Sequence, residues 1–104
     1  MLQQGDVLLK KIESLPVDGR PVARKERGFI LADGEVTGHA HVITDEVVDV
    51  KLVEKNGVLY LGCDGDVIVR HEEHGHITVP AGNYEVGRVR EYDHFAEEAR
   101  QVQD

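Results

Sequence analysis

Five of the six histidines fall in two short windows of the sequence, about thirty residues apart. The first window is the run TGHAH at 37–41, and the second is HEEHGH at 71–76. Imidazole is the commonest metal ligand in proteins, and it is also the side chain that changes charge near neutral pH. The two windows therefore predict either a metal site or a site of proton transfer.

The first window precedes a strand-like apolar run. Side chains two residues apart on a strand point to the same face. We therefore expect His39, His41 and Ile43 to share one face, while Ala40 and Val42 lie on the other. Two imidazole rings on one face of a rigid strand can converge on a single ion.

The second window ends another strand-like run, at 67–71. In that run His71 has the same phase as the apolar valines, so it is expected to point into the interior. We expect His74 to follow in the turn. His76 is out of phase with the next apolar residues and is expected to face water.

Three imidazoles with one oxygen or water form the open arrangement of catalytic zinc sites, and two imidazoles with a carboxylate form the non-heme iron alternative. Histidines from both windows are expected to share one site for a divalent metal. The candidate ligands among them are His39, His41, His71 and His74.

Two carboxylates lie inside the second window and are the candidates for moving protons. These are Glu72 and Glu73. Without a metal, His71 or His74 beside one of them is expected to serve as a general base.

The elements that must position these residues are predicted to be strands. Valine is abundant and aromatic residues are scarce, which favours strands over helices. Asp33-Gly34, Asn56-Gly57 and Asp64-Gly65 are tight-turn pairs, and together they predict a meander of antiparallel strands. Residues 6–12 read as a strand whose lysines suit a sheet edge. The expected fold is all-β, a small antiparallel barrel or sandwich.

The length of 104 residues predicts a single β domain spanning 1–104. Residues 76–79 and 84–90 are expected to pair around the bend at Pro80-Ala81-Gly82. Only the end of the chain has helical spacing, with Asp93 as a cap, so a short C-terminal helix is predicted at about 94–102.

Charge and composition exclude several classes of function. The net charge of −8 argues against a non-specific grip on nucleic acid or on an anionic membrane. The single cysteine, Cys63, allows no internal disulfide and is expected to be a small strand residue. No signal-peptide pattern and no run near the roughly 20 apolar residues of a membrane span is present, so a cytoplasmic protein is expected.

Part of the sequence resembles the cupin superfamily, over about residues 35–90. His39-Ala40-His41, followed by Glu46, resembles the first cupin motif, and Gly75 followed by Pro80-Ala81-Gly82 resembles the second. The resemblance implies a small β-barrel whose mouth holds zinc, iron, nickel or manganese.

In residue terms, the resemblance implies His39, His41 and Glu46 as metal ligands. Glu85 stands where the second motif carries a histidine, and it becomes an unusual fourth ligand. The resemblance gives no role to His71 or His74. Both windows, the Pro-x-Gly-x-Tyr segment and Arg90-Glu91-Tyr92 also resemble a set of short uncharacterised bacterial proteins, which favours treating the two windows as one site.

Two functional hypotheses follow. The first is a metal-binding protein that acts as a small metalloenzyme, in which the ion polarises a substrate oxygen or activates water. The second is a non-catalytic interaction or regulatory module whose histidines hold a structural metal or sense pH. The substrate or protein partner is not identified by the sequence. The oligomeric state is left open, and forming a homodimer would add core to so small a domain.

Overall fold

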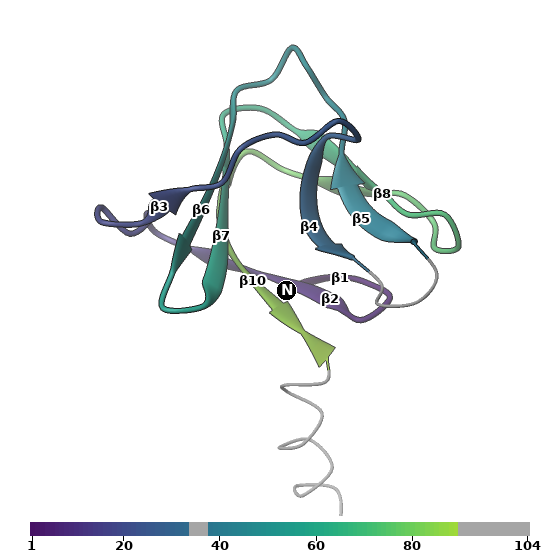
Figure 1. Ribbon diagram of the computed structural model, residues 1–104, viewed down its shortest axis with the longest axis horizontal. Coiled ribbons are helices and arrows are strands. Elements are labelled where there is room, and N and C mark those ends of the chain that lie inside the picture. The colour runs from purple at the N-terminus through teal and green to yellow at the C-terminus, as the bar shows by residue number, and fades with distance from the viewer. Residues whose placement is uncertain (34–37, 90–104) are drawn as a thin grey trace, which may run out of the picture.

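Two antiparallel sheets pack against each other in the computed structural model, which describes residues 1–33 and 38–89 (Figure 1). In order across the larger sheet lie β1 (Leu2–Gln4), β2 (Val7–Ile12), β10 (Gly82–Arg88), β7 (Val58–Cys63), β6 (Val50–Lys55) and β3 (Arg20–Pro21). The smaller sheet consists of β4 (Phe29–Asp33), β5 (Ala40–Ile43), β8 (Val67–Arg70) and β9 (Ile77–Val79). The all-β prediction is confirmed. The sheets do not close into a barrel, so of the two predicted architectures the sandwich is nearer.

The predicted hairpins are present. Asn56 and Gly57 join β6 to β7 with φ angles of 53° and 79°, the positive values that a type I′ turn needs at both central positions. Strands β4 and β5 also pair antiparallel, although Gly34 of their predicted turn lies outside the described residues. Strand β5 begins at Ala40, so His39 stands just before it.

The predicted meander is wrong. Strand β10 lies between β2 and β7, and β8 belongs to the other sheet from β7. Strands β9 and β10 likewise belong to different sheets, so the strand pair expected around Pro80-Ala81-Gly82 does not form. A turn dipeptide fixes a local reversal of the chain, but burial of the next apolar face decides which sheet the strand joins. Both bends carry the chain from one sheet to the other.

The N-terminal hairpin was not predicted. Gly5 (φ 56°) and Asp6 turn the chain between β1 and β2, with Gln4 opposite Val7. Strand β2 is therefore internal along its first half. It lacks a β1 partner from Lys10 onward, so the predicted edge holds for the lysine end of the strand.

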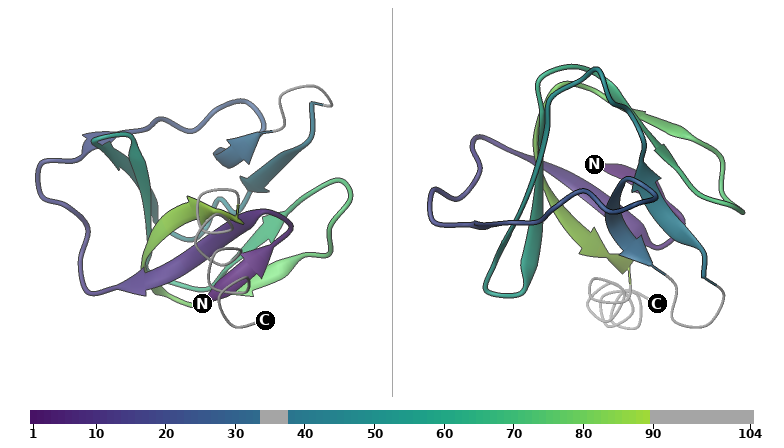
Figure 2. Two further views of the ribbon diagram at one scale, coloured as in Figure 1. Left: turned by 90° about the horizontal axis from the view of Figure 1, so that it is seen from below. Right: turned by 45° about the horizontal axis from the view of Figure 1, so that its top comes forward.

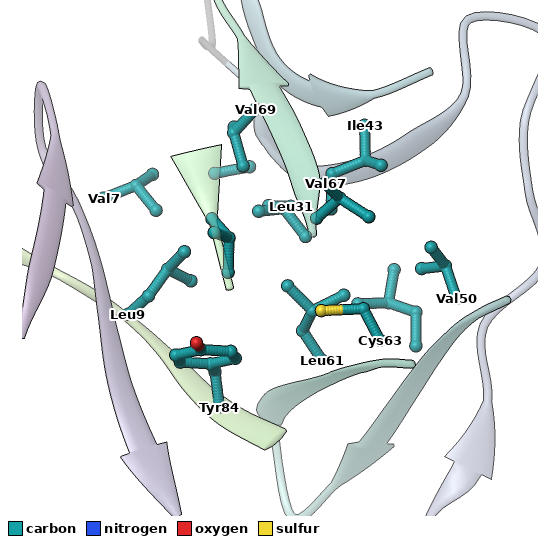
Figure 3. Packing of buried hydrophobic residues seen from close by; sticks show 13 residues of the cluster. Val7, Leu9, Leu31, Ile43, Val50, Leu61, Cys63, Val67, Val69 and Tyr84 are labelled. Atoms are coloured by element: carbon teal, nitrogen blue, oxygen red, sulfur yellow. The ribbon is translucent and has the colours of Figure 1, made fainter. Parts of the chain in front are cut away.

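The core forms where the two inner faces meet (Figure 3). Leu9, Leu61 and Tyr84 from the larger sheet contact a cluster that includes Ile43 and Val67 from the smaller one. Cys63 is buried in the same cluster, and burial raises the pKa of its thiol. It is a small strand residue, as predicted.

The predicted helix at 94–102 lies outside the described residues. Within residues 1–33 and 38–89, no helix is long and apolar enough to cross a membrane.

Candidate functional site

Three segments far apart in sequence meet at one end of the sandwich. They are the β1–β2 turn, the beginning of β5 and the turn that follows β8, and they lie on the same side of the molecule in two views (right in Figure 1 and in the left panel of Figure 2). Together they gather a histidine cluster, defined as His39, His41, His71 and His74. The prediction that both histidine windows belong to one site is consistent with this arrangement.

The cluster is compact, with His71 in the middle. Its ring centroid lies 4.4 Å from that of His41, 4.6 Å from that of His74 and 5.7 Å from that of His39. The rings of His41 and His74 are 6.0 Å apart and nearly parallel. These separations bring four imidazoles within reach of a small common volume.

Gln4 sets the protonation pattern of His41. The Gln4 side-chain amide is buried, and its Nε2 donates to the backbone oxygens of Val69 (2.9 Å) and Gly75 (2.8 Å). Because carbonyl oxygens only accept, the amide nitrogen must face them and Oε1 must face Nδ1 of His41, at 2.8 Å. The His41 ring therefore carries a proton on Nδ1, and the neutral ring presents a lone pair on Nε2.

That lone pair faces a carboxylate. Nε2 of His41 lies 3.3 Å from Oδ1 of Asp6. Burial, and then repulsion from His71, lower the pKa of His41, while the Asp6 carboxylate opposes the shift. In the neutral ring two acceptors confront each other, an arrangement that calls for a proton or a cation between them.

His71 has the opposite polarity. Its Nδ1 accepts hydrogen bonds from the backbone N–H groups of Glu73 (3.0 Å) and His74 (3.3 Å). The neutral ring therefore carries its proton on Nε2 and presents a donor. For His71 to bind a metal through Nε2, the turn would have to release both hydrogen bonds.

The two predicted proton carriers differ in their surroundings. Glu72 accepts the backbone N–H of Ala40 through Oε1 (2.9 Å), and its Oε2 pairs with Arg27. The hydrogen bond from Ala40, helped by Arg27, lowers the pKa of Glu72 to about 2. Such a carboxylate is a poor general base near neutral pH, and its contacts instead tie the start of β5 to the second histidine window.

Glu73 faces the histidines. Its Oε1 lies 3.3 Å from Nδ1 of His39, and most of its side chain is exposed. Both residues line a pocket of about 200 Å³ together with Asp6, Asp33, His41, His71 and Arg88. Of the two predicted carboxylates, Glu73 is the one beside this pocket.

His74 packs against the N-terminal hairpin. A Cβ atom placed on Gly5 would lie 2.4 Å from Nε2 of the His74 ring. The ring therefore occupies the space that only glycine leaves open, one residue from Asp6. Glycine at position 5 is therefore favoured for two reasons, the positive φ of the turn and the close approach of the His74 ring.

The remaining candidates lie elsewhere. The Glu46 side chain is 83% exposed and lies 3.7 Å from Arg24. Glu85 stands on β10 opposite Lys10 and Tyr60, and its neighbour Tyr84 is the one that enters the core. His76 is exposed and lies against Arg70, at 3.4 Å, in keeping with its expected place in water.

The fit to a metal ion is partial. Among residues 1–33 and 38–89, no group of three or more histidine, cysteine or acidic side chains is arranged so that it could hold an ion as it stands. One pair does have suitable spacing, because two ligands about 2.1 Å from one ion lie roughly 3.3 Å apart, the separation between Nε2 of His41 and Oδ1 of Asp6. A third ligand requires a ring rotation, and the candidate is the exposed His74, whose ring packs against the N-terminal hairpin.

Sequence reasoning missed Gln4 and Asp6. A usable signal was present, since Gly-Asp is a two-residue hairpin pair and it directly precedes the apolar run Val7–Leu9. Recognising that hairpin places Gln4 at the end of a strand and Asp6 in its turn. Nothing in the sequence indicated that this turn would meet the histidines.

Replacing Glu72 with glutamine is expected to lower the melting temperature at neutral pH. Glutamine keeps an acceptor for Ala40 but loses the charge that pairs with Arg27. Because the folded-state pKa of Glu72 is depressed, its contribution is present above the ordinary value of 4.5 and is lost as the pH falls toward 2.

Thermal unfolding followed by circular dichroism from pH 7 to pH 2 measures this. The difference between wild type and variant should shrink toward the acid end. Glu46→Gln, which removes an exposed carboxylate from a looser arginine pair, is the control and should change little. A difference in melting temperature between wild type and Glu72→Gln that stays constant with pH would contradict the role given to the Glu72 carboxylate.

The fold and the site define a two-sheet β domain with a histidine cluster at one end of the sandwich. A family model described as a domain of unknown function (DUF8820) matches residues 3–89, and the chain belongs to that family. No curated protein and no solved structure gives a match.

Proposed function

We propose that this domain binds a divalent transition-metal ion at the histidine cluster, with His41 as the principal ligand. The observation that carries the proposal is the pair formed by His41 and Asp6. Gln4 holds the His41 proton on Nδ1, so the Nε2 lone pair meets a carboxylate oxygen at 3.3 Å. A cation between the two atoms converts a repulsive contact into two favourable ones.

The partners of His41 resemble those around known metal ligands. A ligating histidine usually donates its other ring N–H to a fixed acceptor, and such acceptors tune metal affinity. Gln4 has this relation to His41, and it is itself fixed by two backbone oxygens. In the proposed site Asp6 supplies an oxygen and His74 rotates to supply a second nitrogen.

With His41, Asp6 and His74 as its protein ligands, the ion would resemble those of catalytic rather than structural sites. When bound, it supplies Lewis-acid activation of an oxygen. His71 then serves as a hydrogen-bond donor through Nε2–H, and Glu73 beside His39 is the carboxylate placed to take up a proton. The domain is thus proposed as a small metal-dependent protein whose pocket admits a small molecule.

Titration of the full chain, purified without a histidine tag, with Zn²⁺, Mn²⁺, Ni²⁺ and Fe²⁺ tests the proposal. At least one ion is expected to bind with one-to-one stoichiometry in isothermal calorimetry. Because the proposal makes His41 the principal ligand, His41→Ala should weaken that binding by at least about a hundredfold. His76→Ala removes an exposed histidine that lies against Arg70 and serves as the matched control, with affinity unchanged.

Two results would contradict the proposal that the histidine cluster binds a metal ion. One is the absence of stoichiometric binding for all four ions. The other is equal loss of affinity in His41→Ala and His76→Ala, since that pattern indicates loose binding by surface imidazoles.

A metal-free acid–base site is the second candidate, and the polarity of His71 favours it. His71 presents a ring donor while His41, 4.4 Å away between centroids, presents a ring acceptor. Such a pair can pass a proton without an ion. The calorimetric titration separates the candidates, because only the first requires stoichiometric metal.

A further inference from the structure

A second pocket lies on the opposite face of β5 from His41. It has a volume of about 290 Å³ and is here called the outer groove. Residues of alternate phase on β5 form part of its wall, because neighbouring side chains on a strand point to opposite faces. The lining residues are Arg27, Ala40, Val42, Thr44, Arg70, His71 and Glu72.

The outer groove combines an apolar wall with cationic groups. Ala40 and Val42 supply the apolar part, and Arg27 and Arg70 supply guanidinium groups. In a chain of net charge −8, a groove lined by two arginines and one carboxylate, Glu72, departs locally from the overall charge. Guanidinium groups bind carboxylates and phosphates through paired hydrogen bonds.

Arg70 is the arginine available to a ligand. Arg27 already pairs with Glu72 and donates to the backbone oxygen of Gly38. Arg70 lies against the His76 ring, and across residues 1–33 and 38–89 no carboxylate lies within ion-pair distance of it. An exposed guanidinium beside an apolar wall suits an anion with a hydrocarbon stem.

His71 connects the outer groove to the histidine cluster. It lines both the outer groove and the pocket that contains His41 and Asp6. A molecule anchored in the outer groove therefore has one end next to the His71 ring, which is itself a member of the histidine cluster. The two pockets form adjoining parts of one extended site.

We propose that the outer groove binds the anionic end of a small organic molecule, a carboxylate or a phosphate monoester with an apolar stem. Arg70 pairs with the anion, and the stem lies on Ala40 and Val42. The inference that the histidine cluster acts on the other end of the molecule rests on the proposed function. The binding of the anion in the outer groove does not depend on that function.

Nuclear magnetic resonance titrations of the metal-free full chain test the proposal, with benzoate and phenyl phosphate as probes and benzamide as their neutral counterpart. Either anion should shift the amide signals of Ala40, Val42 and His71, and the tighter of the two identifies the preferred head group. Benzamide should bind at least about tenfold more weakly than the anions, because it lacks the charged hydrogen bond.

Variants locate the interaction. Arg70→Gln should weaken the binding of the anion about tenfold. Arg20→Gln removes an exposed arginine on the other sheet, where it pairs with Glu54, and should leave anion binding unchanged. Equal binding of benzamide, an unchanged affinity in Arg70→Gln, or shifted signals remote from the outer groove would overturn the proposal.

The test also separates this proposal from the metal assignment. His41→Ala should retain anion binding, and Arg70→Gln should retain metal binding. Anion binding that appears only after metal is added would assign the anion to the ion and overturn the outer groove as its site.

Discussion

Replacing Gln4 with leucine is expected to lower the free energy of unfolding by about 3 kcal/mol, a large share of the stability of so small a domain. The Gln4 side chain makes three hydrogen bonds in a buried setting, to the His41 ring and to two backbone oxygens. Leucine fills the volume but cannot form the hydrogen bonds that these partners make with Gln4. Each buried polar group left unpaired costs about 1–3 kcal/mol. Urea unfolding followed by circular dichroism measures the change.

The neighbouring residue provides a matched control. Gln3 donates one hydrogen bond to the backbone oxygen of Gly5, but it does so at the exposed surface of the same strand. Gln3→Leu should therefore change the stability by no more than about 0.5 kcal/mol. Similar losses in the two variants would show that the effect comes from strand β1 in general rather than from the buried amide.

Gln4→Leu should also release the His41 ring. With Gln4 absent, Nδ1 loses the acceptor that fixes its proton, and nitrogen-15 chemical shifts of the ring should move toward a mixture of the two neutral tautomers. Metal affinity should fall by about ten- to a hundredfold, the usual cost of removing a partner that orients a ligating histidine. An unchanged ring signal would contradict the role given to Gln4.

Replacing Gly5 with alanine is expected to displace His74 from the cluster. The added methyl would lie 2.4 Å from Nε2 of that ring, and the exposed ring can give way only by rotating. Alanine at a φ of 56° also carries the cost of a left-handed backbone, about 1 kcal/mol. We expect lower stability and, if His74 is a ligand, about tenfold weaker metal binding.

Gly57→Ala separates the two effects. Gly57 also has a positive φ, 79°, but a Cβ placed there meets no atom within 4 Å. It should show a similar backbone cost with no change in metal affinity. Calorimetric titration and thermal unfolding of both variants provide the comparison, and equal metal affinities would show that His74 is not a ligand.

Local patterns in the sequence predicted much of the secondary structure. Alternation and turn dipeptides found the hairpin at Asn56-Gly57 and separated His41 from Ala40 and Val42 on β5, because both depend on neighbouring residues. The order of strands across the sheets was not predictable in this way. Whether β10 inserts beside β2 depends on which apolar faces can be buried together, and that is a property of the whole chain.

The candidate site was predicted in part for the same reason. Histidine clustering is visible in the sequence, and it identified the four rings that the fold brings together. The cupin comparison led to Glu46 and Glu85 as ligands, whereas the fold puts Asp6 beside His41 and leaves Glu46 in solvent. A carboxylate contributed by a distant hairpin leaves no pattern near the histidines.

The hydrogen bonds of Gln4 to distant parts of the chain have a consequence for the folding kinetics. The Gln4 side chain bonds to His41 and Val69, which lie 37 and 65 positions away from it along the chain. Contacts of such high sequence separation form late, because long loops must close first, and domains dominated by them fold in milliseconds to seconds. The histidine cluster is therefore complete only after both sheets have docked. A nascent or partly unfolded chain carries the same histidines without the arrangement that gives them their polarity.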